Sequence, residues 1–185
     1  MIFFRVGLEE SITLPAPPID DKSEAEEVKV IVANRSAKDV ESIRNHDQEP
    51  FYAIRKFCEK KGLIFHDGEF DQIIDESVPI ISYFKKHFNR DRPVEVDTTI
   101  NTLPSKTNKT KSYPSGHAAQ SRLIARYVAG KFPEHERELI KAGDEGGYGR
   151  VKAGFHYVSD YDAGNLLGEK MYIFMNKADY KKENE

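Results

Sequence analysis

The chain has 185 residues, and its 28 Lys and Arg residues against 31 Asp and Glu residues give a formal net charge of −3 at pH 7. This length is sufficient for one domain with its own hydrophobic core. The charge balance gives no sign of a nucleic-acid footprint or a polybasic membrane patch, so we expect no nucleic-acid partner. The lone Cys58 excludes an intramolecular disulfide, and no spacing resembles a zinc site, which favours a reducing compartment.

The apolar segments of the sequence are all short. The first residues, "MIFFRVGLEE", contain a brief apolar run that Arg5 interrupts, which is too short for the apolar region of a signal peptide. No run approaches the roughly 20 apolar residues needed to cross a bilayer. The sequence therefore predicts a soluble, cytoplasmic protein without membrane insertion.

Two segments open the chain before the clear helical patterns begin. Residues 1–21 are expected to form an extended N-terminal lead-in on the surface, because "LPAPPIDD" (14–21) contains three prolines. Residues 22–35 carry helix formers and a Ser23 cap with Glu26 three positions later, although their Val-Lys-Val-Ile-Val run also suits a strand.

Apolar residues at helical spacing dominate the rest of the chain. Helices are predicted over 37–46, 49–62, 71–88, 115–132, 133–147 and 155–176. The polar stretch between them, 94–113, is predicted to be a long loop that shapes the entrance of a site. Hairpin patterns and internal repeats are not evident, so the predicted class is all-α: one helical-bundle domain over 22–176 and a polar tail over 177–185.

A short stretch before one predicted helix, "KSYPSGHAAQS" (111–121), has the features of an anion site. Ser115 can cap the helix, and the backbone N–H groups of Ser115, Gly116 and His117 are predicted to point outwards from its positive end. Gly116 lacks the Cβ that would keep a tetrahedral oxyanion away from the backbone. Alone, "PSGH" is more typical of an ordinary helix cap.

Two further segments hold charged groups that suit the same ligand. In "KKHFNRDRP" (85–93), Lys85 and Arg92 are seven positions apart and would share one helix side if the helix continues. In "GRVKAGFHYVSDYDAG" (149–164), Asp160 follows His156 by four positions, so on one helix its carboxylate could hydrogen-bond the imidazole. Each pattern alone is common on helix surfaces.

Together, and in this order, the three segments resemble the signature of the type 2 phosphatidic acid phosphatase (PAP2) and vanadium haloperoxidase superfamily. "SYPSGHAAQS" and "GFHYVSDYDAG" are most similar to bacterial class A non-specific acid phosphatases, whose lead-in resembles "LPAPP". The resemblance covers about residues 85–170. The third motif usually begins Ser-Arg, whereas this chain has Gly149-Arg150, and the lost hydroxyl could weaken local hydrogen bonding.

The resemblance implies a role for each matching residue. His156 is the nucleophile, Asp160 orients it, and His117 acts first as general acid and then as general base. The phosphate-binding residues it implies are Lys85, Arg92, Ser115, Gly116 and Arg150. It implies no metal ion and no cofactor, vanadate as an inhibitor, and a homodimer.

The expected activity is metal-independent hydrolysis of a small soluble phosphomonoester, such as a nucleotide or sugar phosphate, through a phosphohistidine. Pyrophosphate is a further candidate substrate. Two alternatives stay open. The first is a vanadium-dependent haloperoxidase, because the same residues can hold vanadate. The second is a non-catalytic phosphate-binding module.

Overall fold

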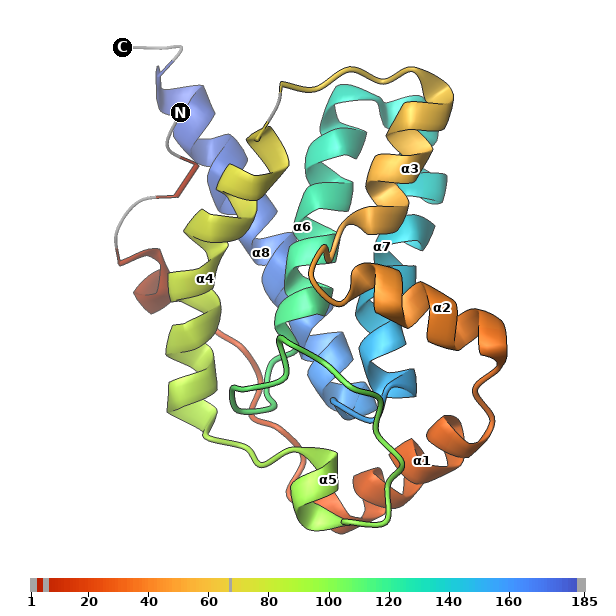
Figure 1. Ribbon diagram of the computed structural model, residues 1–185. Coiled ribbons are helices and arrows are strands. Elements are labelled where there is room, and N and C mark those ends of the chain that lie inside the picture. Colours follow the sequence, from red (N-terminus) through yellow and green to blue (C-terminus); the bar gives the residue numbers. More distant parts are fainter. Residues whose placement is uncertain (1–2, 5–6, 67, 183–185) are drawn as a thin grey trace.

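The protein is described by a computed structural model that covers residues 3–4, 7–66 and 68–182 (Figure 1). Its elements are η1 (Leu8–Ser11), α1 (Asp21–Ala33), α2 (Ala37–His46), α3 (Tyr52–Lys61), α4 (Glu69–Phe88), α5 (Pro93–Val96), α6 (Gly116–Lys131), η2 (Pro133–His135), α7 (Glu136–Lys152) and α8 (Val158–Lys182). The described residues contain helices and no strand, which confirms the predicted all-α class.

Helix α6 lies at the centre of the bundle and packs against both α7 and α8, while α4 covers another side (Figure 1). Glycines on the neighbouring helices make this packing close. A Cβ at Gly164 of α8 would lie 2.5 Å from the carbonyl oxygen of Ser115, and one at Gly168 would lie 2.5 Å from that of Ala119. Real Cβ atoms do not approach a backbone so closely, so these two positions require glycine.

The glycines near the end of α7 have the same packing role, which corrects one prediction. The predicted helix 133–147 was expected to end at its glycines, whereas α7 continues to Lys152. A Cβ at Gly146 would lie 2.4 Å from the carbonyl oxygen of Pro50, and one at Gly147 would lie 3.0 Å from the Cα of Ala118. Glycine here permits close contact and does not break the helix.

Neither motif pair shares one helix: the predicted end of the helix 71–88 is confirmed, whereas the predicted helix 155–176 begins later than expected. Helix α4 ends at Phe88 because Asn89 adopts a left-handed conformation (φ 47°), so Arg92 does not continue that helix and instead precedes α5. Helix α8 begins at Val158, so His156 lies in the turn after α7 and only Asp160 is helical. In both cases a short irregular connection brings the side chains together.

The N-terminal segments also contribute to the core. The sequence of residues 22–35 suited either a helix or a strand, and the structure places them in the helix α1 and the turn after it. The cap of α1 is Asp20, whose carboxylate accepts from the backbone N–H of Ser23 at 3.0 Å. Leu8, Ile12 and Leu14 of the lead-in are buried in the main hydrophobic cluster. At the other end, α8 includes residues 177–182 of the predicted tail, and 183–185 lie outside the described residues.

Candidate active site

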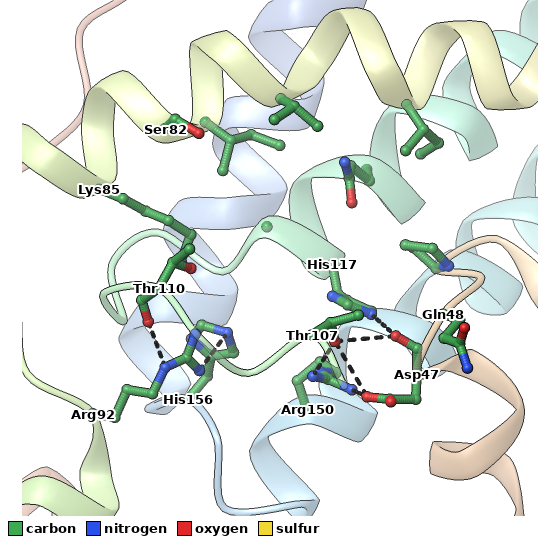
Figure 2. Close-up of a pocket in the computed structure, with 16 residues that line it drawn as sticks. Asp47, Gln48, Ser82, Lys85, Arg92, Thr107, Thr110, His117, Arg150 and His156 are labelled. Carbon is green, nitrogen blue, oxygen red and sulfur yellow. Dashed lines mark hydrogen bonds and ion pairs between the residues drawn. The ribbon is translucent and has the colours of Figure 1, made fainter. Parts of the chain in front are cut away.

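A pocket of about 290 Å³ opens beside the N-terminus of α6 (Figure 2). Of the eight predicted site residues, six line it: Lys85, Arg92, Gly116, His117, Arg150 and His156. The other two, Ser115 and Asp160, are buried behind it. Three predicted helices and two irregular connections thus bring all three sequence motifs to one place.

Two of the basic side chains are held by backbone carbonyl groups. Lys85 Nζ donates to the carbonyl oxygens of Lys111 (2.5 Å) and Ser112 (3.2 Å), and burial, followed by repulsion from Arg92, lowers its pKa to about 7. Arg92 donates through Nε to Thr110 O (2.7 Å), and burial lowers its pKa to about 10. An anion in the pocket would favour the charged form of both side chains.

The third cation, Arg150, is 2% exposed and is fixed on both sides of its guanidinium group. Nη1 donates to the Asp47 carboxylate at 2.8 Å, and Nη2 donates to the hydroxyl groups of Ser105 (3.2 Å) and Thr107 (3.0 Å). Its Nε is buried without a hydrogen-bond partner among the described residues. A buried donor without a partner is costly, so an oxyanion at this position would be stabilised.

These contacts also concern Gly149, which stands where the third motif usually has serine. Ser105 and Thr107 supply hydroxyl groups to Arg150, so the guanidinium group does not depend on a hydroxyl from position 149. A Cβ at Gly149 would meet Ile43 at an ordinary 3.5 Å. Packing therefore leaves room for serine there.

His156 and Asp160 form a buried pair. His156 Nδ1 lies 3.1 Å from Asp160 Oδ2, and since a carboxylate accepts, Nδ1 carries the proton and Nε2 has the lone pair. Nε2 lies 3.4 Å from Nη1 of Arg92 (Figure 2). Burial, followed by repulsion from Arg92, holds the pKa of His156 well below its usual value. The ring is therefore neutral and can act as a nucleophile.

Two residues that the sequence analysis did not select fix Asp160. Arg90 Nη1 donates to its Oδ1 at 2.8 Å, and the Ser112 hydroxyl donates to its Oδ2 at 2.5 Å. Burial raises the pKa of Asp160, while these donors oppose that change. Arg90 is itself paired with Asp21 and Glu24 of α1. Both Arg90 and Ser112 lie inside the quoted motifs, and this position is the feature of the sequence that could have identified them.

His117 lies on the opposite side of the pocket from Lys85 and beside Asp47 (Figure 2). Its Nε2 donates to the carbonyl oxygens of His46 (3.1 Å) and Asp47 (3.0 Å). Burial, followed by repulsion from Arg150, lowers its pKa to about 3. In this state the ring is neutral, and within the described residues Nδ1 makes no hydrogen bond.

Asp47 is a further residue that the sequence analysis missed. Its carbonyl oxygen accepts from His117 and its carboxylate accepts from Arg150. Burial raises the pKa of this carboxyl group, but hydrogen bonds from Ser105, the Lys106 N–H and Arg150 together lower it to about 2. It follows the helix 37–46 directly and belongs to no motif, so no pattern marked it.

Ser115 differs from its expected geometry. Its hydroxyl accepts from the Ala118 N–H at 3.4 Å as the cap of α6, as predicted, but its own N–H donates to the Asp160 carbonyl oxygen at 2.9 Å. That N–H does not point freely outwards. A Cβ at Gly116 would meet only Ile81 and Lys85, at 3.5 and 3.9 Å, so protein packing alone does not demand glycine.

No group of three or more His, Cys, Asp or Glu side chains among the described residues could hold a metal ion. None of the helices in the described part of the chain is long and apolar enough to cross a membrane.

Comparisons with known proteins find a matching family model and several similar proteins. A family model described as "PAP2 superfamily" matches residues 75–183. A non-specific acid phosphatase of Salmonella typhi is 40% identical over 87 residues, which cover 45% of this chain and 35% of that protein. An acid phosphatase of Zymomonas mobilis is 30% identical over 105 residues, covering 55% and 40% of the two chains. The matches therefore span well under half of these relatives.

A solved structure shares the fold. It is titled a transmembrane PAP2 type phosphatidylglycerolphosphate phosphatase from Bacillus subtilis, and it superposes with a TM-score of 0.61 over 94% of this chain and 91% of that one. The sequence identity is 18%, so this likeness concerns the fold alone.

Proposed function

Because the chain belongs to the PAP2 superfamily, we propose that it is a metal-independent phosphatase that hydrolyses small soluble phosphomonoesters through a phosphohistidine. The observation that carries the proposal is the position of the His156 ring. This neutral ring is fixed through Nδ1 by Asp160 and lines a pocket together with three basic side chains, one of which, Arg92, lies 3.4 Å from Nε2. The resemblance to acid phosphatases supports the same activity.

In the first step, His156 Nε2 attacks phosphorus and the P–O bond to the alcohol breaks. The new imidazolium keeps its Nδ1 proton and is stabilised by Asp160. Charge on the transferred phosphoryl oxygens is stabilised by Lys85, Arg92 and the unpartnered Nε of Arg150. The Gly116 and His117 N–H groups at the start of α6 add two further donors.

His117 supplies the proton to the leaving alcohol in this proposal. Because Nε2 already donates to two carbonyl groups, Nδ1 is the atom that takes up and transfers a proton. Burial and then repulsion from Arg150 lower the pKa of His117, and a bound phosphate dianion would raise that pKa by offsetting the charge of Arg150. In the second step, His117 accepts a proton from water, water oxygen bonds to phosphorus, and the N–P bond breaks to release phosphate.

The first experiment measures hydrolysis of p-nitrophenyl phosphate by the purified chain in excess EDTA, with and without vanadate. We expect turnover in EDTA and inhibition by vanadate, which resembles the five-coordinate phosphorus. The variant His156→Ala should lose roughly 10³-fold or more in kcat because the nucleophile is gone. The matched control is His66→Ala, at an exposed histidine that does not line this pocket.

The possible outcomes separate the candidate functions. Substantial activity in pure His156→Ala protein contradicts the phosphohistidine. If vanadate binds but no phosphomonoester, nucleotide and sugar phosphate included, is hydrolysed, the chain is a binding module or a haloperoxidase. Oxidation of bromide by peroxide after vanadate loading then distinguishes these two.

A further inference from the structure

The pocket has an apolar half that the phosphoryl chemistry does not use. Ile74, Val78 and Ile81 of α4 line it at helical spacing, and Pro50 lines it from the connection between α2 and α3. Lys85 is one further turn along the same side of α4. One face of α4 therefore passes from apolar side chains to the cation that would hold a phosphate.

The two halves are in direct contact. Ile81 Cγ2 would lie 3.5 Å from a Cβ at Gly116, where the helix start meets the phosphate end of the pocket. Val78 is an apolar side chain with an exposed fraction of 46%, so nearly half of its surface stays open to solvent or to a ligand. An ester bound with its phosphoryl group among the cations could extend its alcohol along this face.

The walls of this half offer little to a polyhydroxyl ligand. The charged residues that line the pocket are Asp47, Lys85, Arg92 and Arg150, and all belong to the phosphate half described above. Gln120, on the facing side of α6, already donates through Nε2 to the Ser77 hydroxyl at 3.2 Å. The uncharged polar side chains beside this face are Gln48, Ser82 and Gln120. Each hydroxyl group of a sugar would lose water and would have to find its partner among these three side chains, whereas an alkyl or aryl group would gain from burial against the apolar face.

We propose that the apolar face of α4 is the alcohol subsite and that the preferred substrates are short alkyl or single-ring aryl phosphomonoesters rather than sugar phosphates. This inference rests on the proposed function and narrows its substrate class. Val78 and Ile74 are then specificity-determining residues that act on the alcohol and not on the phosphoryl group. The pocket volume of about 290 Å³ leaves room for a phosphoryl group and one small apolar group.

The test is a series of n-alkyl phosphates from ethyl to hexyl, because their leaving alcohols have nearly constant acidity and differ mainly in apolar area. For the wild type we expect kcat/KM to rise by up to about fourfold per CH₂ until the subsite is filled. Glycerol phosphate should stay near the ethyl ester. In Val78→Ser, hexyl phosphate should lose about fivefold to tenfold relative to wild type while ethyl phosphate changes less than twofold.

The matched control is Val30→Ser, at another exposed helical valine, 55% exposed and outside the pocket. It should leave the whole series unchanged. The variant Val78→Leu, which keeps an apolar side chain, should retain the preference for long chains. A flat series, or equal effects of Val78→Ser and Val30→Ser on an active enzyme, would overturn the subsite and leave the proposed function intact.

Binding of n-alkylphosphonates, which cannot be hydrolysed, tests the subsite without catalysis. Affinity measured by calorimetry should rise with chain length in wild type and rise less in Val78→Ser. If the affinities rise but no ester is hydrolysed, the subsite stands and the proposed function fails. If they are independent of chain length, the subsite is contradicted whether or not the enzyme turns over.

Discussion

At the scale of single residues, the pocket brings several basic side chains together, and burial raises the free energy of their charged forms. Lys85 shows the effect most clearly, because its pKa of about 7 leaves it partly deprotonated at neutral pH when no anion is bound. An anion that binds beside it must restore the proton. Affinity for anions is therefore coupled to pH through this side chain.

Sulfate tests this coupling because its charge is constant between pH 6 and 9. We expect sulfate affinity, measured by calorimetry, to fall as the pH rises above 7, by up to about tenfold per pH unit for one linked proton. Lys85→Arg should flatten the dependence, since its guanidinium group stays protonated. Constant wild-type affinity across this range, with no proton uptake in buffers of different ionisation enthalpy, would contradict the coupling.

The residue scale also shows what the sequence could predict about the site. The motif residues are recognisable because the three segments together resemble the PAP2 signature, and six of the eight predicted residues line one pocket. Asp47 was missed because its role depends on where α2 ends relative to α6 and α7, and that is a tertiary relation. Arg90 was missed because its basic neighbours in "KKHFNRDRP" are equally charged, and only its burial distinguishes it.

At the scale of elements, helix positions were predicted well wherever an apolar period was long. One error fell where a local signal and a packing requirement use the same residues. Gly146 and Gly147 indicated the end of a helix by sequence, but in the fold they let α7 approach Pro50 and α6. A sequence pattern alone cannot tell these two uses of glycine apart.

A pair of glycine substitutions tests the packing explanation. Gly164→Ala should lower the free energy of unfolding by about 1–3 kcal/mol, because its Cβ would collide with the Ser115 carbonyl group. It should also reduce kcat by moving the start of α6. Gly149→Ala, at an open helical position, should raise the free energy of unfolding by about 0.5–1 kcal/mol. Chemical denaturation measures both, and equal effects would contradict the explanation.

At the scale of the whole molecule, the fold removes three histidines from water, His46 and His156 fully and His117 in part. Burial lowers the pKa of His46, His117 and His156 below the value of an unfolded histidine. The unfolded chain therefore binds protons at a higher pH than the folded one. The stability that these groups confer is fully present above about pH 6.5 and is lost as the pH falls below it.

Denaturation by urea at pH 7.5, 6 and 5 tests this prediction. The free energy of unfolding should decrease below pH 6.5 by up to about 1.4 kcal/mol per pH unit for each buried histidine. His156→Gln should show a shallower decrease than wild type because one of the three groups is gone. Equal stability at pH 7.5 and 5 would contradict the prediction, because it would mean that the folded and unfolded chains take up the same number of protons over this range.

The contact between His117 and the end of α2 determines which segments would have to be transferred to build this site in another protein. The ring is held by two successive carbonyl groups from residues 46 and 47, which precede the span matched by the family model, 75–183. A graft of the three motifs onto another helical scaffold would carry the basic side chains and both histidines, but His117, the proposed general acid, would lack the two carbonyl groups that accept from its Nε2. A graft that keeps this contact must therefore include the three motifs together with the turn that connects α2 to α3.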